Sequence, residues 1–148
     1  MRWETRILHS GDQELLCDAA AGVFDEIPDP HLVAEFLSDH RHHIAVAFDR
    51  GQVIGFASGV NYVHPDKPPE LWINEVGVAP DYQGRGVGKA VVRALLLHAE
   101  GLGCREAWVL TDESNRVARR LYASTGGQES PQVMFTFFLK GRTDRARS

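Results

Sequence analysis

Apolar residues recur along this chain at spacings that predict its secondary structure. Leu15, Leu16, Ala19 and Val23 follow one another at helical intervals, as in a helix with one buried face. Short apolar runs bounded by Gly, Pro or Asp are typical of strands. The patterns predict, in chain order, a strand at 5–8, helices at 12–23 and 30–39, strands at 43–48, 52–62 and 71–78, a helix at 86–100, a strand at 107–110, a helix at 114–124 and a strand at 133–139.

Local signals support several of these boundaries. Pro28 cannot continue a helix, and Asp29 can cap the second helix with Pro30 at its first position. The segment Asp49-Arg50-Gly51 predicts a hairpin turn between two strands. The resulting order, βααβββαβαβ, indicates an α/β fold of mixed layers.

Length and composition set limits on the class of protein. The 148 residues suit one domain, which we place at residues 1–140, followed by a flexible basic tail at 141–148. No apolar run approaches the ~20 residues needed to span a membrane, and no signal peptide is visible. Cys17 and Cys104 are far apart and lack metal-ligand spacing. We expect a soluble, cytoplasmic protein without disulfides and without a membrane partner.

Charge is distributed unevenly along the chain. Residues 1–82 hold 14 Asp and Glu against 5 Lys and Arg, a net of −9, whereas residues 83–139 have a net of +2. An acidic first half argues against a nucleic-acid surface there, because phosphate binding needs clustered cations. It would suit a cationic partner, and the second half an anionic one. The alternative is solvated charge with no functional meaning.

The segment with the clearest chemistry is the glycine-dense stretch 75–89, where a strand runs into a loop and a helix begins at once. Such a loop lets backbone N–H groups converge on an anion at the helix N-terminus, where the helix dipole also favours it. A P-loop is excluded, because Gln83 stands where its first glycine is required and Ala90 where Ser or Thr is required. The spacing and mid-chain position also exclude a dinucleotide fingerprint. What remains is the pattern Gln83-x-x-Gly86-x-Gly88.

This pattern resembles the acetyl-CoA signature of the Gcn5-related N-acetyltransferase (GNAT) superfamily. A second hallmark of that family follows at its expected place, in Glu113-Ser114-Asn115, Ala118, Leu121-Tyr122 and Gly126. The resemblance covers nearly the whole chain and implies a mixed, mostly antiparallel central sheet flanked by helices. Segments 45–49, 69–78 and 133–135 also resemble the small aminoglycoside 3-N-acetyltransferases, with departures at 128–131, Trp72 and Asn74.

The resemblance implies that acetyl-CoA is the co-substrate and that a homodimer forms. Its pyrophosphate is expected on the backbone of residues 85–88, and its thioester oxygen near the N–H groups of residues 76–78. The implied cofactor-binding residues are Val76, Gly77, Val78, Gln83, Gly84, Arg85, Gly86, Val87, Gly88, Lys89 and Asn115, the last by contact with the pantetheine arm.

Amide transfer needs a base for the amine and an acid for the leaving thiolate. Glu75, on the strand beside the loop, is the candidate base, acting directly or through water, and Tyr122 is the candidate acid. The alternatives are a carboxylate that only pairs with a cation and a tyrosine that only fills the core. Residues His40, His42 and His43 do not have dependable metal-ligand spacing, so no metal is expected.

The expected acceptor is a cationic small-molecule amine, an aminoglycoside in particular, held by carboxylates of the acidic half. The candidate substrate-binding residues are Asp25, Glu26, Asp29, Glu70, Glu75 and Asp112. Two alternatives stay open: a protein, peptide or polyamine N-acetyltransferase, and a non-catalytic acyl-CoA sensor. The presence of Glu75 and Tyr122 weighs against the sensor.

Overall fold

The computed structural model of the chain describes residues 3–140. Its core is a five-stranded sheet in the order β1-β2-β3-β4-β5, formed by Glu4–Ile7, His42–Asp49, Gln52–Tyr62, Glu70–Val78 and Glu106–Trp108. Neighbouring strands are antiparallel except β4 and β5, which are parallel. The helices are α1 (Gln13–Cys17), α2 (Pro30–Ser38), α3 (Val87–Gly101) and α4 (Arg116–Ser124), with a 3-10 turn at Pro80–Tyr82. The predicted fold class is confirmed.

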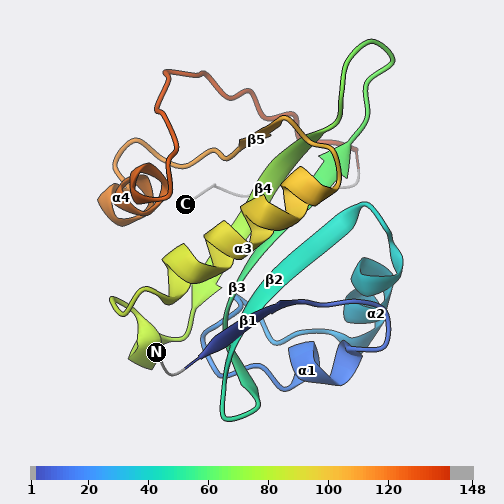
Figure 1. The fold of residues 1–148 in the computed structure, drawn as a ribbon, viewed down its shortest axis with the longest axis vertical. Helices are drawn as coiled ribbons and strands as arrows, with labels where there is room; N and C mark the ends of the chain where they lie inside the picture. The colour runs from blue at the N-terminus through green and yellow to red at the C-terminus, as the bar shows by residue number, and fades with distance from the viewer. Residues whose placement is uncertain (1–2, 141–148) are drawn as a thin grey trace.

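Helices pack on both faces of the sheet, with α3 running diagonally across one of them (Figure 1). Successive side chains of β2 point to opposite faces of the sheet. Ile44, Val46 and Phe48 point toward α1 and α2, whereas Ala45 and Ala47 lie under α3. Small residues on the α3 face let the helix approach closely: a Cβ on Gly55 would lie only 2.6 Å from Val87 Cγ1.

The first predicted helix is much shorter than the pattern indicated. It was expected over residues 12–23 but ends at Cys17. The backbone N–H of Ala20 donates to the carbonyl of Val53 on β3 (2.9 Å), and Gly22 has φ +84°, outside the helical region. Val23 is still buried, so its helical spacing reflects a contact with the core rather than a continued helix.

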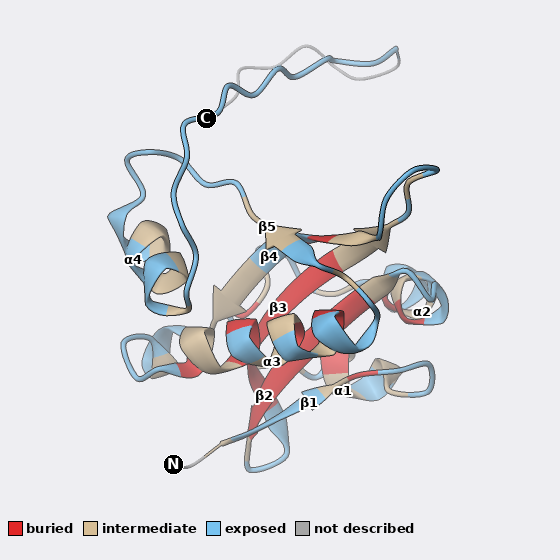
Figure 2. Cartoon of the chain, turned by 45° about the horizontal axis from the view of Figure 1, so that its top comes forward, coloured by how far each residue is buried: buried red, intermediate tan, exposed pale blue. Residues whose placement is uncertain are grey.

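The strand predicted over residues 133–139 is wrong. Those residues have no regular structure in the described chain, and Figure 2 shows the segment running clear of the sheet. Val133, Phe135 and Phe137 are 79–82% exposed. The neighbouring strand β5 pairs over only three residues, from Glu106 to Trp108, and therefore has few ladder positions to offer.

Other boundaries shift by one or two residues. The strand predicted at 107–110 is Glu106–Trp108, and Ala107 and Trp108 are half-buried in it. The helix predicted from residue 114 starts at Arg116, after the N-cap Asn115. The predicted cap of α2 is confirmed, since the Asp29 carboxylate accepts from the N–H groups of His31 (2.8 Å) and Leu32 (3.3 Å). The predicted tail at 141–148 lies outside the described residues.

Candidate active site

The glycine-dense loop ends at the N-terminus of α3. Gly84 and Gly86 have φ +76° and +92°, a region that side chains strain to enter, and Gly86 is the N-cap. Because glycine has no side chain to cap the helix, the first-turn N–H groups have no partner within α3. These donors, together with the helix dipole, can hold a phosphate.

Two side chains brace this loop from within. Gln83 donates its Nε2–H to the carbonyl of Val78 (3.2 Å), which fixes the end of β4. The Tyr82 hydroxyl donates to Asp49 in the β2–β3 turn, and this hydrogen bond raises the pKa of Tyr82. The guanidinium of Arg85 lies 5.4 Å above the Tyr82 ring. Gln83 therefore has a structural role in the loop, whatever contact it makes with a cofactor.

A β-bulge in β4 re-aims the strand beside this loop. Gly59 pairs with Ile73 and Ser58 with Glu75, so Asn74 is the extra residue. After the bulge the Glu75 side chain is exposed on the α1/α2 face of the sheet, while Val76 packs against the cluster under α3. Beyond Trp72, within the described residues, β4 has no strand pairing on its β5 side, so backbone groups along this edge can meet a ligand.

Tyr122 is on the other side of β4 from Glu75. It projects from α4, is half-buried and packs against the cluster that also receives Val76 and Val78. Burial raises the pKa of its phenol, which keeps the proton on the oxygen. Tyr122 also lines a cavity of about 290 Å³ between α3, β5 and the turn after α4. The fold thus places the candidate base and acid on opposite faces of one strand.

The start of α4 is fixed by two polar side chains. Asn115 Oδ1 caps the helix by accepting from the N–H of Ala118 (3.0 Å), so only its amide NH₂ is left for the pantetheine contact implied by the resemblance. Arg119 binds Glu129 through two hydrogen bonds (2.6 and 3.1 Å) and donates to the carbonyl of Glu113 (2.7 Å). Sequence reasoning missed this Arg119–Glu129 pair, because no spacing rule joins a helix to the loop that follows it.

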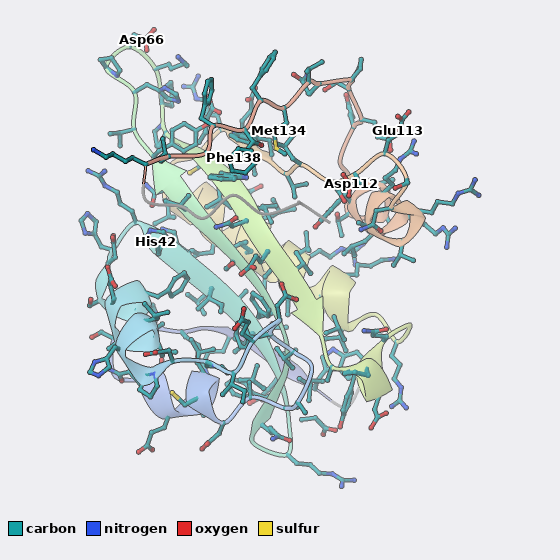
Figure 3. All side chains as sticks on the ribbon, turned by 180° about the vertical axis from the view of Figure 1, so that it is seen from behind. His42, Asp66, Asp112, Glu113, Met134 and Phe138 are labelled. Carbon is teal, nitrogen blue, oxygen red and sulfur yellow. The ribbon has the colours of Figure 1, made fainter. Side chains whose placement is uncertain are left out.

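The carboxylates predicted to bind substrate fall into two groups. The carbonyl of Val23 lies against Gly77, which brings the chain just before Asp25 and Glu26 onto β4; both carboxylates are exposed. Figure 3 shows Asp112 beside α4, near the end of β5. These three side chains and Glu75 are exposed and available to a ligand. Asp29 is also exposed, but its Oδ1 caps α2, and Glu70 is bound into a network of its own strand neighbours. Contact of these two carboxylates with the acceptor stays a prediction.

The Glu70 network consists of aromatic residues that sequence reasoning did not assign. The Tyr62 hydroxyl donates to Glu70 Oε1 (2.9 Å), and the Trp108 indole N–H lies 3.1 Å from the same oxygen. His64 Nε2 is 3.3 Å from Glu70 Oε2. The hydrogen bond from Tyr62 is the main reason that the pKa of Glu70 is lowered. The only signal in the sequence was one aromatic residue in each of the three strands, Tyr62 in β3, Trp72 in β4 and Trp108 in β5.

Two of the histidines noted in the sequence, His42 and His43, have structural partners. His43 Nε2 is 2.6 Å from Asn61 Oδ1, and its Nδ1 is 3.0 Å from His98 Nε2 on α3. A hydrogen bond between the two rings requires at least one neutral ring as acceptor, and the contacts fit two neutral rings, with His98 donating to His43 and His43 donating to Asn61. Burial is the main cause that lowers the pKa of both histidines. His42 lies 4.0 Å from Asp39.

Within residues 3–140, no group of three or more His, Cys, Asp or Glu side chains converges as metal ligands. In the same range, none of the helices is both long and apolar enough to cross a bilayer.

Comparison with known proteins identifies the family. Residues 12–126 match the family described as acetyltransferase (GNAT) family. The chain is 36% identical over 124 residues to N-alpha-acetyltransferase RimI of Mycobacterium tuberculosis, covering 82% of this chain and 75% of that protein. It is 29% identical over 99 residues to the aminoglycoside N(6')-acetyltransferase type 1 of Salmonella typhimurium, covering 63% of this chain and 68% of that one.

The fold has a solved counterpart. An aminoglycoside acetyltransferase from an uncultured soil metagenomic sample, in complex with sisomicin, superposes with a TM-score of 0.83 at 20% identity, covering 94% of this chain and 97% of that chain. The chain belongs to the GNAT family and is an N-acetyltransferase.

Proposed function

We propose that the protein transfers an acetyl group from acetyl-CoA to a primary amine of a cationic small molecule, most specifically an aminoglycoside. The observation that carries this proposal is the arrangement around β4: phosphate-binding N–H groups at the start of α3 adjoin a bulged strand that exposes Glu75. Neutralising a polyphosphate and deprotonating an amine are the two tasks that such a transferase must combine.

The donor-side residues fit acetyl-CoA, which supplies the reactive thioester carbonyl. The N–H groups of Val87 and Gly88 would bind its pyrophosphate, with Arg85 and Lys89 adding positive charge at the same end of α3. A Cβ on Gly88 would lie 3.5 Å from Leu121, so helices α3 and α4 adjoin at this end. The unpaired edge of β4 can accept the amide-rich pantetheine arm as a further strand would be accepted.

Two side chains would move the protons. Glu75 takes a proton from the acceptor ammonium, directly or through water, and thereby frees the nitrogen lone pair for attack. A new C–N bond forms as the C–S bond breaks, and backbone N–H groups of residues 76–78 stabilise the negative charge on the oxygen. Tyr122 gives its phenolic proton to the departing sulfur, and the second proton that the acetylated nitrogen must lose passes through water to restore the phenol. The products are an acetamide and a free thiol.

Charge and relatives support the aminoglycoside acceptor. Exposed Asp25, Glu26, Glu75 and Asp112 surround the β4 edge with negative charge, which attracts a polycation. The 29% identical relative is an aminoglycoside acetyltransferase by name. The resemblance noted in the sequence favours the amine at position 3, whereas that relative is named for position 6'. We keep position 3 as the hypothesis, and fragment-ion analysis of the product distinguishes the two.

A second candidate acceptor is the α-amine of a protein or peptide. The 36% identical relative is an N-alpha-acetyltransferase by name, and it matches a larger share of the chain. Both candidates use the same donor machinery, so only the acceptor separates them.

A substrate panel with acetyl-CoA and thiol detection tests the proposal. It should contain gentamicin-type and other aminoglycosides, linear polyamines, and peptides with free N-termini. Turnover of amino sugars that falls as salt is added supports the proposal, because screening weakens attraction between exposed charges. Turnover of peptides with none on any amino sugar contradicts it and supports the second candidate.

We further propose a homodimer in the cytoplasm that confers aminoglycoside resistance on its host. Exposed Val133, Met134, Phe135 and Phe137 supply apolar surface for a second copy. Cys17 and Cys104 are free thiols in the structure, as expected in a reducing compartment. Sedimentation tests the dimer, fractionation tests the location, and growth of an expressing strain on the antibiotic tests resistance.

A further inference from the structure

Two tryptophans from neighbouring strands form a stacked pair on the sheet. Trp72 of β4 and Trp108 of β5 are direct partners in the parallel ladder, with ring centroids 5.5 Å apart and planes 14° from parallel. Trp72 is 37% exposed, although a tryptophan normally gains stability by burial. An indole held in place while still open to solvent is a surface that a ligand can use.

Polar neighbours fix the position of this pair. The Trp108 N–H donates to both the Tyr62 hydroxyl (2.9 Å) and Glu70 (3.1 Å), and the Tyr62 ring meets Trp108 edge-on at 6.4 Å. Tyr62 in turn donates to Glu70. Because the polar atom of Trp108 is satisfied within this network, its ring cannot easily turn away from Trp72. The platform is therefore set before any ligand arrives, which lowers the entropy cost of binding.

The pair is on the same face of β4 as the candidate base. Trp72 pairs with Val60 and Glu75 with Ser58, and residues at alternate positions of β3 share a face. Because the bulge sets three residues of β4 against two steps of β3, Trp72 and Glu75 are ~7 Å apart along the strand, a distance that a ligand of two linked sugar rings can span. Trp72, Asn74 and Glu75 are all exposed. A ring resting on Trp72 would thus place an amine of the next ring close to Glu75.

The carboxylates and indole faces around the tryptophan pair favour one class of ligand. Glu106, exposed at the start of β5, and Glu75 place carboxylates on both sides of Trp72 along the face. An indole face attracts both apolar C–H groups and nearby cations. A saturated ring with one apolar face and ammonium substituents satisfies both requirements. A linear polyamine offers the charge without the ring.

We propose that the Trp72–Trp108 pair is the acceptor platform, on which an amino-sugar ring stacks while its ammonium groups face Glu75 and Glu106. This inference rests on the proposed function and names the feature of the acceptor that the site reads. Trp72 contacts the sugar ring, whereas Glu70 and Tyr62 hold the tryptophan pair in position and do not bind the cation.

The test compares Trp72→Leu and Trp72→Phe with the parent protein. Trp72→Leu keeps apolar bulk without the aromatic face, so it should raise KM for an aminoglycoside about 10- to 100-fold and change kcat by less than about 3-fold. Trp72→Phe should recover part of the loss, because it restores an aromatic face at this position. Circular dichroism and Tm show that each variant is folded. An aminoglycoside KM that is unchanged in folded Trp72→Leu overturns the platform and leaves the proposed function standing.

Tryptophan fluorescence measures binding of an aminoglycoside in the absence of turnover. The chain has three tryptophans, so a Trp3→Phe background leaves only the stacked pair as emitters. Saturable quenching on titration with kanamycin supports the platform independently of turnover. Emission that does not change at kanamycin concentrations that saturate turnover overturns it. If the parent protein acetylates peptides alone, the proposed acceptor is wrong, and the absence of quenching by kanamycin then overturns the platform as well.

Discussion

Replacing Gly86 by alanine should weaken coenzyme binding far more than it weakens the fold. Gly86 has φ +92° at the N-cap of α3, and a Cβ added there meets no protein atom within 4 Å. Gly51, in the β2–β3 turn, is a matched control: its φ is +79°, and a Cβ there also meets nothing within 4 Å. The two substitutions impose the same kind of backbone strain at different places.

The cost to stability follows from that strain. A non-glycine residue in the left-handed region costs about 1–2 kcal/mol. For a chain near 150 residues this corresponds to a fall in Tm of about 2–8 °C, and both variants should show it. Differential scanning fluorimetry of Gly86→Ala and Gly51→Ala without ligand gives this baseline.

The cost to binding should differ between the two variants. Only at Gly86 does the new methyl group stand beside the first-turn N–H groups that would hold the pyrophosphate. Losing one hydrogen bond to a charged group costs about 1.5–3 kcal/mol, or about 10- to 150-fold in Kd. Calorimetry with acetyl-CoA should show this loss in Gly86→Ala and unchanged affinity in Gly51→Ala. The bulkier Gly86→Val should abolish binding. Parent affinity in a folded Gly86→Ala variant would refute the placement of the phosphates.

Three further predictions concern catalysis and stability. Glu75→Gln and Tyr122→Phe should each lower kcat by about 10²- to 10⁴-fold, the Tyr122 change acting mainly on kcat, as steady-state kinetics would show. Stability should fall as pH drops below about 6.5, because His43 and His98 are neutral when folded but protonate at their ordinary pKa when unfolded. Urea melts should show a slope of up to about 1.4 kcal/mol per pH unit for each proton taken up. Gly77→Ala should cost about 1–3 kcal/mol in the same melts, because its Cβ would collide with the carbonyl of Val23.

Each of these has a control and a contradicting result. Parent kcat in both catalytic variants, measured with the true acceptor, would show that the assigned roles are wrong. The pH slope should flatten in His98→Leu and persist in His31→Gln, whose histidine is exposed on α2. A slope that persists unchanged in His98→Leu would contradict the neutral pair. Equal stability of Gly77→Ala and the parent would contradict the close approach of residue 23 to β4.

Local chemistry made part of the fold predictable. The glycine loop, the cap at Asp29 and the start of α3 depend on residues that are adjacent in sequence, so spacing alone identified them. The end of α1 depends instead on Ala20 binding Val53, a partner 33 positions away. A helical apolar period cannot register such a competing contact. The same limit explains why residues 133–139 look like a strand: their composition favours one, but a strand also needs a partner edge.

The candidate site also combines features that local sequence predicts with features that depend on distant contacts. The sequence indicated Glu75, beside the glycine-dense loop, and Tyr122 as the candidate base and acid, and the structure adds that they are on opposite faces of β4. The sequence could not indicate that Glu70 is hydrogen-bonded to Tyr62 and Trp108, because those contacts join three strands. Nor could it separate a free carboxylate from one that caps a helix. A count of acidic residues predicts the sign of the ligand's charge, whereas the contacts of each carboxylate decide which of them can bind it.

The most direct test of the proposed acceptor is a competition experiment followed by mass spectrometry. Purified protein is given acetyl-CoA with an equimolar mixture of kanamycin, spermidine and a peptide with a free N-terminus, and products are followed at early times. Kanamycin should gain one acetyl group well before either competitor, and Glu75→Gln should slow this product by about 10²-fold or more. Acetylation of the peptide with kanamycin left unmodified would contradict the proposed acceptor.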